Sequence, residues 1–202
     1  MMLTTHVLAG LALALPVVVI APEFAVVAPV AGAVGGALPD ADMYAGHRRT
    51  LHFPVWYSIV SGPALVLALV VPTTATVALA LVLVGAAVHC VMDVFGGGLE
   101  LRPWEGRSDR AVYDHYHDRW IPPRQLIGYD GSPKDLALAA ALAVPSLVVL
   151  EAPFHALVLA LLGISTIYVL LRRRLAALAP VLVARLPVSL RRYVPERYVE
   201  DD

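Results

Sequence analysis

The sequence predicts an all-α integral membrane protein, a bundle of about six apolar helices with a long cytoplasmic loop between the fourth and the fifth. The first observation is composition: of 202 residues, 59% are hydrophobic and 15% are charged, whereas soluble domains average roughly 45–50% and about 25%. The second is that the apolar residues fall into runs close to the length of a membrane-spanning helix. The third is that the basic residues occupy only every second segment between these runs.

The apolar runs alternate with short turns and longer polar segments. They cover residues 3–20, 24–38, 55–71, 75–95, 136–150 and 154–171. A helix that crosses a bilayer needs about 20 apolar residues, with a range of about 17–25. The second and fifth runs are short by this measure, so the sequence leaves open whether they cross the membrane or re-enter it.

The basic residues indicate the orientation of the bundle. All fifteen Lys and Arg lie in the segments 39–54, 96–135 and 172–202. With six crossings, these segments and the N-terminus share one side, and the positive-inside rule assigns that side to the cytoplasm. We therefore expect a multi-pass protein of the cell (inner) membrane with both termini in the cytoplasm.

The polar segments suggest a simple domain organisation. We expect a membrane-embedded helical domain over 1–175 and a cytoplasmic C-terminal tail over 176–202. The loop 96–135 far exceeds the typical connector of about 4–6 residues. Because it contains Trp104 and Trp120, we expect it to pack on the membrane surface as a cap.

Histidines and aspartates from distant segments reach one predicted membrane boundary. These residues are His6, Asp40, Asp42, His47, His52, His89 and Asp93. His89 and Asp93 are four residues apart, which places them on one face of a helix, and ionisable groups inside a span are costly unless they face the bundle interior. After Pro39 we expect extended backbone, in which Asp40 and Asp42 point the same way.

These donor types indicate a metal site. Imidazole nitrogen and carboxylate oxygen without thiolate suit zinc, manganese or iron, and the single cysteine excludes a thiolate-rich site. We take zinc as the first choice, with manganese or iron as alternatives. Seven donors exceed the four that one tetrahedral zinc needs. The sequence therefore allows two metals, or one metal with supporting residues.

Each residue also has a simpler interpretation. His6 can be an interface residue, His89 with Asp93 a structural pair, Asp40 with Asp42 a turn, and His47 with Arg48 and Arg49 a lipid headgroup contact. We expect His115 and His117 to belong to a surface loop and His155 to lie at the opposite membrane interface. The joint arrangement of the seven donors favours a shared site over these separate roles.

Four short elements together resemble a known family. They are "THVLAG" at 5–10, "LPDAD" at 38–42, "HRRTLH" at 47–52 and "HCVMD" at 89–93, and they cover roughly the first half of the chain. In this order they resemble the YdjM-like inner-membrane metal-dependent hydrolases, which are distantly similar to zinc-dependent phospholipases. The resemblance implies that the seven donors are metal ligands or their supports.

The third element departs from the family pattern. In the family a Thr directly precedes the second His and a Ser follows it. Here Leu51 precedes His52, Phe53 follows it, and Thr50 lies one position early. The departure removes the support for a catalytic hydroxyl but leaves the spacing of His47 and His52 intact.

Two classes of function follow. The first is a metal-dependent hydrolase at the cytoplasmic face, with Asp42 or Asp93 as the general base. Arg48 and Arg49 would bind an anionic substrate, such as a lipid or another phosphoester.

The second class is a non-catalytic metal- or ion-binding membrane protein or transporter. Against transport, the polar groups lie at one boundary, not at the midplane where transporters bind their substrates. In either case we expect membrane lipids as partners, and the net charge of −1 does not predict a nucleic-acid partner. The sequence does not indicate an oligomeric state.

Overall fold

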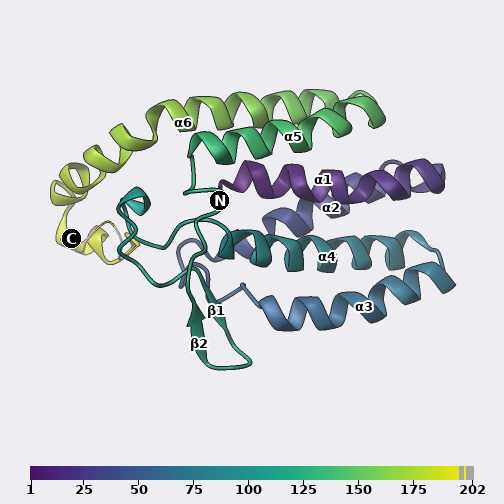
Figure 1. The fold of residues 1–202 in the computed structure, drawn as a ribbon, viewed down its shortest axis with the longest axis horizontal. Coiled ribbons are helices and arrows are strands. Elements are labelled where there is room, and N and C mark those ends of the chain that lie inside the picture. Colours follow the sequence, from purple (N-terminus) through teal and green to yellow (C-terminus); the bar gives the residue numbers. More distant parts are fainter. Residues whose placement is uncertain (196–197, 199–202) are drawn as a thin grey trace.

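The computed structural model describes residues 1–195 and 198, and over these residues the chain is mostly helical (Figure 1). The helices are α1 (Leu3–Ile20), α2 (Val27–Ala37), α3 (Pro54–Val70), α4 (Thr74–Val94), α5 (Pro133–Val149), α6 (Phe154–Ala184) and α7 (Val188–Arg191). A short antiparallel hairpin pairs β1 (Val112–Asp114) with β2 (Arg119–Ile121). The predicted all-α class is confirmed, with this hairpin as the only sheet in the described part.

The helices α1 to α6 lie side by side and alternate in direction along the chain (Figure 1). The N-terminus, the hairpin and the C-terminal end of α6 therefore gather at one end of the bundle. Short turns connect the helices at the other end. The loops 38–53 and 95–132 both lie at the first end, which we call the polar end.

Three of the predicted spans are long and apolar enough to cross a membrane, namely α1, α4 and α6. The helix α3 is a shorter apolar helix of 17 residues. The second predicted run is shorter than expected, because Pro22–Phe24 forms a separate 3-10 turn and leaves α2 with 11 residues. Six membrane-length helices are thus not present in the described chain.

The last long helix, α6, is longer than the sequence predicted. The helix α6 continues past residue 171 to Ala184 and is 31 residues long. The expected boundary between residues 175 and 176 therefore lies inside a helix. Most of the expected tail is described, whereas residues 196–197 and 199–202 lie outside the described residues.

Close packing of α1 against α2 and α4 positions the polar end. The two helices α1 and α2 touch at glycines: a Cβ on Gly10 would lie 1.9 Å from the carbonyl oxygen of Gly32. A Cβ on Gly36 would lie 2.3 Å from the carbonyl oxygen of His6. Small residues permit this backbone approach, so His6 on α1 comes directly beside the end of α2.

Two apolar clusters and one polar anchor hold the bundle together. Leu8 and Leu11 of α1 pack with α5 and α6, and Ala14 packs with α2 and α4. At the polar end, buried Asp135 accepts hydrogen bonds from the Met2 amide (2.8 Å) and the Thr5 hydroxyl (2.7 Å). These bonds tie the start of α5 to the start of α1, next to His6.

Candidate metal centre

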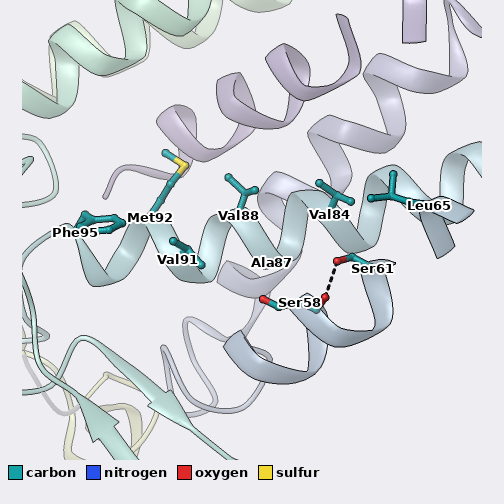
Figure 2. Close-up of a pocket in the computed structure, with 9 residues that line it drawn as sticks. All are labelled: Ser58, Ser61, Leu65, Val84, Ala87, Val88, Val91, Met92 and Phe95. Carbon is teal, nitrogen blue, oxygen red and sulfur yellow. Dashed lines mark hydrogen bonds between the residues drawn. The ribbon is translucent and has the colours of Figure 1, made fainter. Parts of the chain in front are cut away.

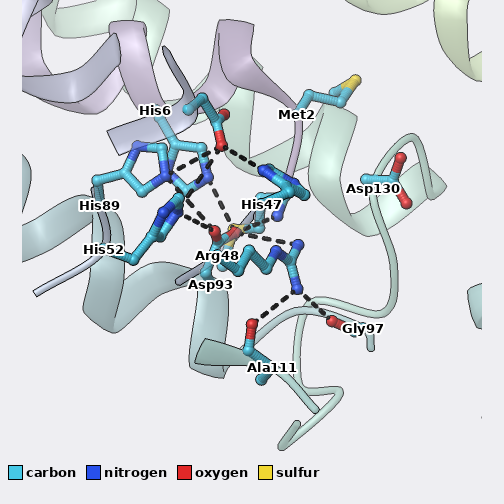
Figure 3. Close-up of polar contacts among 12 residues, drawn as sticks. Met2, His6, His47, Arg48, His52, His89, Asp93, Gly97, Ala111 and Asp130 are labelled. Carbon is cyan, nitrogen blue, oxygen red and sulfur yellow. Dashed lines mark hydrogen bonds and ion pairs between the residues drawn. The ribbon is translucent and has the colours of Figure 1, made fainter. Parts of the chain in front are cut away.

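Four potential ligands from three separate segments meet at the polar end. His89 and Asp93 lie on the last turns of α4, His52 lies two residues before the start of α3, and Asp40 lies in the 3-10 turn Pro39–Asp42. One ligand atom from each of the four lies within 4.8 Å of the others. Figure 3 shows His52, His89 and Asp93 pointing toward one another. This four-donor set can hold a metal ion.

Four of the six distances between the donor atoms are close to the edge lengths of a coordination polyhedron. Nε2 of His89 lies 3.4 Å from Asp93 Oδ2 and 3.5 Å from Asp40 Oδ1. Nε2 of His52 lies 3.4 Å from Asp93 Oδ2 and 3.8 Å from Asp40 Oδ1. A tetrahedron with metal–ligand bonds of about 2.0–2.1 Å has edges of about 3.3–3.4 Å. The distances are therefore slightly long for hydrogen bonds and suitable for ligands that share one cation.

The two imidazoles are oriented by their other nitrogens. His52 Nδ1 lies 2.9 Å from Asp42 Oδ2, and His89 Nδ1 lies 2.7 Å from the carbonyl oxygen of Gly36. Both partners accept hydrogen bonds, so each Nδ1 carries a proton, and in the neutral ring each Nε2 then offers its lone pair to a cation. Both Nε2 atoms are buried and have no hydrogen-bond partner among the described residues. Such orphaned acceptors are costly to bury and fit a metal ligand.

The two carboxylate oxygens of Asp93 have different roles. One faces the other metal-binding side chains, and the other contacts residues that hold Asp93 in place. Its Oδ2 faces His52 and His89. Its Oδ1 lies 3.1 Å from His6 Nε2 and 3.3 Å from an Arg48 guanidinium nitrogen, and the Met1 amino group lies 2.5 Å away. These contacts fix the rotation of the carboxylate, so that one oxygen remains directed at the cation position.

His6 lies beside the four-donor set rather than within it. Its ring stacks on His89 with a centroid distance of 3.7 Å. It is 1% exposed, and its Nε2 contacts the outer oxygen of Asp93. The structure therefore brings His6 to the predicted site, where it holds Asp93 and His89 in place.

Asp42 lies behind His52. Its side chain is fully buried and contacts His47 Nδ1 at 3.1 Å and His52 Nδ1 at 2.9 Å. It also accepts from the backbone amides of Arg48 and Leu51. Burial raises the pKa of Asp42, but the hydrogen bonds from His47 and His52 outweigh burial, so the pKa lies below its usual value.

The segment that contains both aspartates is not extended. Pro39–Asp42 is a 3-10 turn, so Asp40 and Asp42 point in different directions, and the sequence-based expectation was wrong at this point. Asp40 joins the four-donor set, whereas Asp42 supports His52.

The adjacent arginines have different environments. Arg48 is 5% exposed and donates to the carbonyl oxygen of Gly97 at 2.7 Å as well as to Asp93. Its φ of 60° is uncommon for a residue with a Cβ, and such backbone is often found at functional sites. Arg49 instead lies over the Tyr113 ring, 4.5 Å from its centroid. Only Arg48 reaches the four-donor set.

The loop between α4 and α5 contributes backbone groups that the sequence did not reveal. Besides Gly97, the Ala111 carbonyl lies 3.4 Å from Arg48, and the Tyr113 amide donates to the Arg48 carbonyl. Carbonyl and amide groups occur in every residue, so no residue type could have predicted these contacts. They connect the hairpin to the centre through Arg48.

The remaining histidines lie outside the donor set. His115 contacts the Arg49 carbonyl, and His117 contacts Asp114 at 2.6 Å in the hairpin turn. His117 is 51% exposed, as expected for a surface loop. His155 lies at the start of α6, at the opposite end of the bundle.

Comparison with known proteins returned no match to a family model, to a curated protein or to a solved structure.

Proposed function

We propose that this chain is a membrane-bound, metal-dependent hydrolase that acts at the cytoplasmic face of the cell membrane. The main support is the pair of buried imidazole nitrogens on His52 and His89 that lack partners and face two carboxylates. A purely structural cluster would satisfy these atoms. The resemblance of the four sequence elements to YdjM-like hydrolases is consistent with the proposal.

We assign one zinc ion to the four-donor set. Two imidazoles and two carboxylates match the nitrogen and oxygen ligands of zinc, and manganese or iron are the alternatives. A bound cation of this kind activates water and polarises the bond that is cleaved. The other three predicted donors serve as supports: Asp42 orients His52, His6 orients Asp93, and His47 contacts Asp42.

We place the general base at the rim of the centre, where a side chain is accessible to solvent. The His47 side chain is 16% exposed, whereas those of His52 and His89 are inaccessible. Because His47 Nδ1 contacts Asp42 at 3.1 Å, a proton taken up by this ring is stabilised by the carboxylate. We therefore assign proton transfer to the His47–Asp42 pair and a ligand role to Asp93.

Two arginines beside the centre favour an anionic substrate. Arg48 presents a buried guanidinium whose Nε has no partner among the described residues, and Arg49 lies on the surface next to it. Guanidinium groups bind phosphate oxygens with strong charge-assisted hydrogen bonds. A lipid or another phosphoester fits a site at this membrane boundary, with both termini in the cytoplasm according to the positive-inside rule.

Metal analysis provides the decisive test. The protein is purified in detergent, and its bound metal is measured by elemental analysis beside the His89→Ala, Asp93→Ala double variant. We expect about one metal per chain in the wild type and none in the variant, because two of four ligands are lost. A wild-type protein without stoichiometric metal would contradict the proposal.

Turnover is tested separately with chromogenic phosphoesters and phospholipids. Hydrolysis that disappears in the double variant would support an enzyme. A protein that binds metal, transports ions and hydrolyses none of these compounds would instead support the ion-binding alternative.

A further inference from the structure

An apolar groove runs between α3 and α4 (Figure 2). Its volume is about 340 Å³. Two serines and a leucine of α3 form one wall, and residues of α4 together with Phe95 form the other. No charged side chain lines the groove, so its chemistry differs completely from that of the neighbouring centre.

The only hydroxyl groups in the groove have their own partners. Ser58 Oγ donates to the Pro54 carbonyl at 2.7 Å, and Ser61 Oγ donates to the Ser58 carbonyl at 3.0 Å. Both bonds lie within α3, so neither hydroxyl needs a ligand. The groove therefore suits a hydrocarbon chain and not a polar molecule.

The groove and the metal centre use adjacent faces of α4. Val88 and Met92 line the groove and directly precede His89 and Asp93. Consecutive helical residues are about 100° apart around the axis, so the groove lies next to the donor face. Phe95 ends the groove two residues after Asp93, so the groove reaches the polar end.

The length of the groove fits one leaflet of a bilayer. From Val84 to Phe95 it follows α4 for about 16 Å, at about 1.5 Å per residue. Half of the hydrocarbon core of a bilayer is about 15 Å thick. Leu65, Val91 and Phe95 are 42%, 46% and 38% exposed, so a chain can enter the groove from the side.

We propose that the α3–α4 groove holds one acyl chain of a membrane phospholipid whose phosphate headgroup lies at the metal centre. The proposal rests on the hydrolase function and narrows its substrate class from phosphoesters in general to phospholipids. The acyl chain accounts for the apolar groove, and the headgroup accounts for the guanidinium groups of Arg48 and Arg49 beside the centre.

The test uses Ser61→Trp, which fills the groove from α3, and Ile59→Trp as a matched control. Ile59 is 55% exposed on the same helix and does not line the groove. Binding of long-chain phosphatidylglycerol to the detergent-purified, metal-loaded protein is measured by native mass spectrometry. We expect one bound lipid per wild-type chain and about tenfold weaker binding in Ser61→Trp, which corresponds to lost burial of about two methylene groups.

Activity measurements then connect the groove to the centre. Ser61→Trp should raise KM about tenfold for the long-chain lipid, by the same loss of burial, and leave hydrolysis of a water-soluble chromogenic phosphoester unchanged. Metal content equal to that of the wild type shows that the variant is folded. If Ser61→Trp is misfolded, Ser58→Trp fills the groove one turn closer to the centre.

The outcomes separate the two proposals. If the protein hydrolyses phosphoesters but binds no lipid, the groove is not an acyl-chain site, while the proposed hydrolase function stands. The same conclusion follows if Ser61→Trp and Ile59→Trp change lipid binding equally. If Ser61→Trp loses lipid binding but the wild-type protein hydrolyses no substrate, the groove is an acyl-chain site and the proposed hydrolase function is wrong. A change of oligomeric state in Ser61→Trp without an effect on lipid binding would identify the groove as an interface between copies and overturn its assignment to lipid.

Discussion

Two groups of buried and half-buried charged side chains lie at the polar end of the bundle, and they differ in how completely their atoms are paired. In the first group, two carboxylates and two imidazoles converge, and both inner imidazole nitrogens lack partners. In the second group, Arg172 of α6 contacts Asp130 at 3.2 Å and donates to the Leu101 carbonyl at 3.1 Å. The Tyr168 hydroxyl donates to Asp130 at 2.8 Å.

The second group is complete without a ligand. Opposite charges are in direct contact, the Trp104 ring lies 5.3 Å from the Arg172 guanidinium, and none of the orphaned buried atoms in the described chain belongs to Asp130, Tyr168 or Arg172. The group fastens the loop before α5 to α6. The comparison shows that burial of charge does not identify a site, whereas unpaired atoms that converge on one point do.

The largest effect expected from this difference is the loss of metal in His52→Ala. The variant removes one of four ligands and leaves two carboxylates facing each other, so metal affinity should fall more than about 100-fold, beyond the range for supporting residues. Elemental analysis and competition with a chelator measure the change. The matched control Arg172→Gln should keep its metal; loss of metal in both variants would erase the distinction between the groups.

Asp42→Asn should have the next largest effect. The Asp42 carboxylate accepts from Nδ1 of His52, and loss of such a support typically lowers metal affinity about 10–100-fold. Chelator competition measures the affinity. Asp114→Asn provides the control because Asp114 pairs with His117 in the hairpin turn, away from the donor set. Unchanged affinity in Asp42→Asn would show that His52 is held by its packing alone.

Arg172→Gln should lower stability and leave the metal in place. The change removes the charge-assisted hydrogen bonds to Asp130, which are typically worth about 1.5–3 kcal/mol. We expect a loss of about 2 kcal/mol in the free energy of unfolding, measured by thermal denaturation in detergent. Arg173→Gln is the control, since Arg173 also lies over Trp104 but is exposed. Equal losses in both variants would indicate that stacking, and not the ion pair, supports this region.

The smallest effect is expected for Arg49→Gln. The guanidinium of Arg49 lies over the Tyr113 ring on the surface, and exposed contacts of this kind contribute about 0.5–1 kcal/mol. Stability should fall by no more than this amount, with metal content unchanged. Arg48→Gln, which loses buried contacts to Gly97 and Asp93, should cost more. A larger loss of stability in Arg49→Gln than in Arg48→Gln would show that Arg49, and not Arg48, is the arginine that supports the centre.

The sequence predicted the helical class and the convergence of its histidines and aspartates. His89 and Asp93 could be placed from helical periodicity alone, because both lie on one regular helix. The division into ligands and supports could not be predicted, since it depends on the 3-10 turn at Pro39–Asp42 and on which nitrogen of each ring faces inward. The length of α6 could not be predicted from hydropathy, because the apolar run ends at residue 171, before the arginines through which the helix continues.

Gly36 should tolerate substitution poorly. Its carbonyl holds the His89 ring, and its missing side chain lets the His6 backbone approach to a distance that any Cβ would prevent. Replacing it with alanine adds one methyl group far smaller than any ligand, yet it would separate two helices and move both rings. In a saturation mutagenesis screen, Gly36 should therefore be as intolerant as the donor residues, although it has no reactive group of its own.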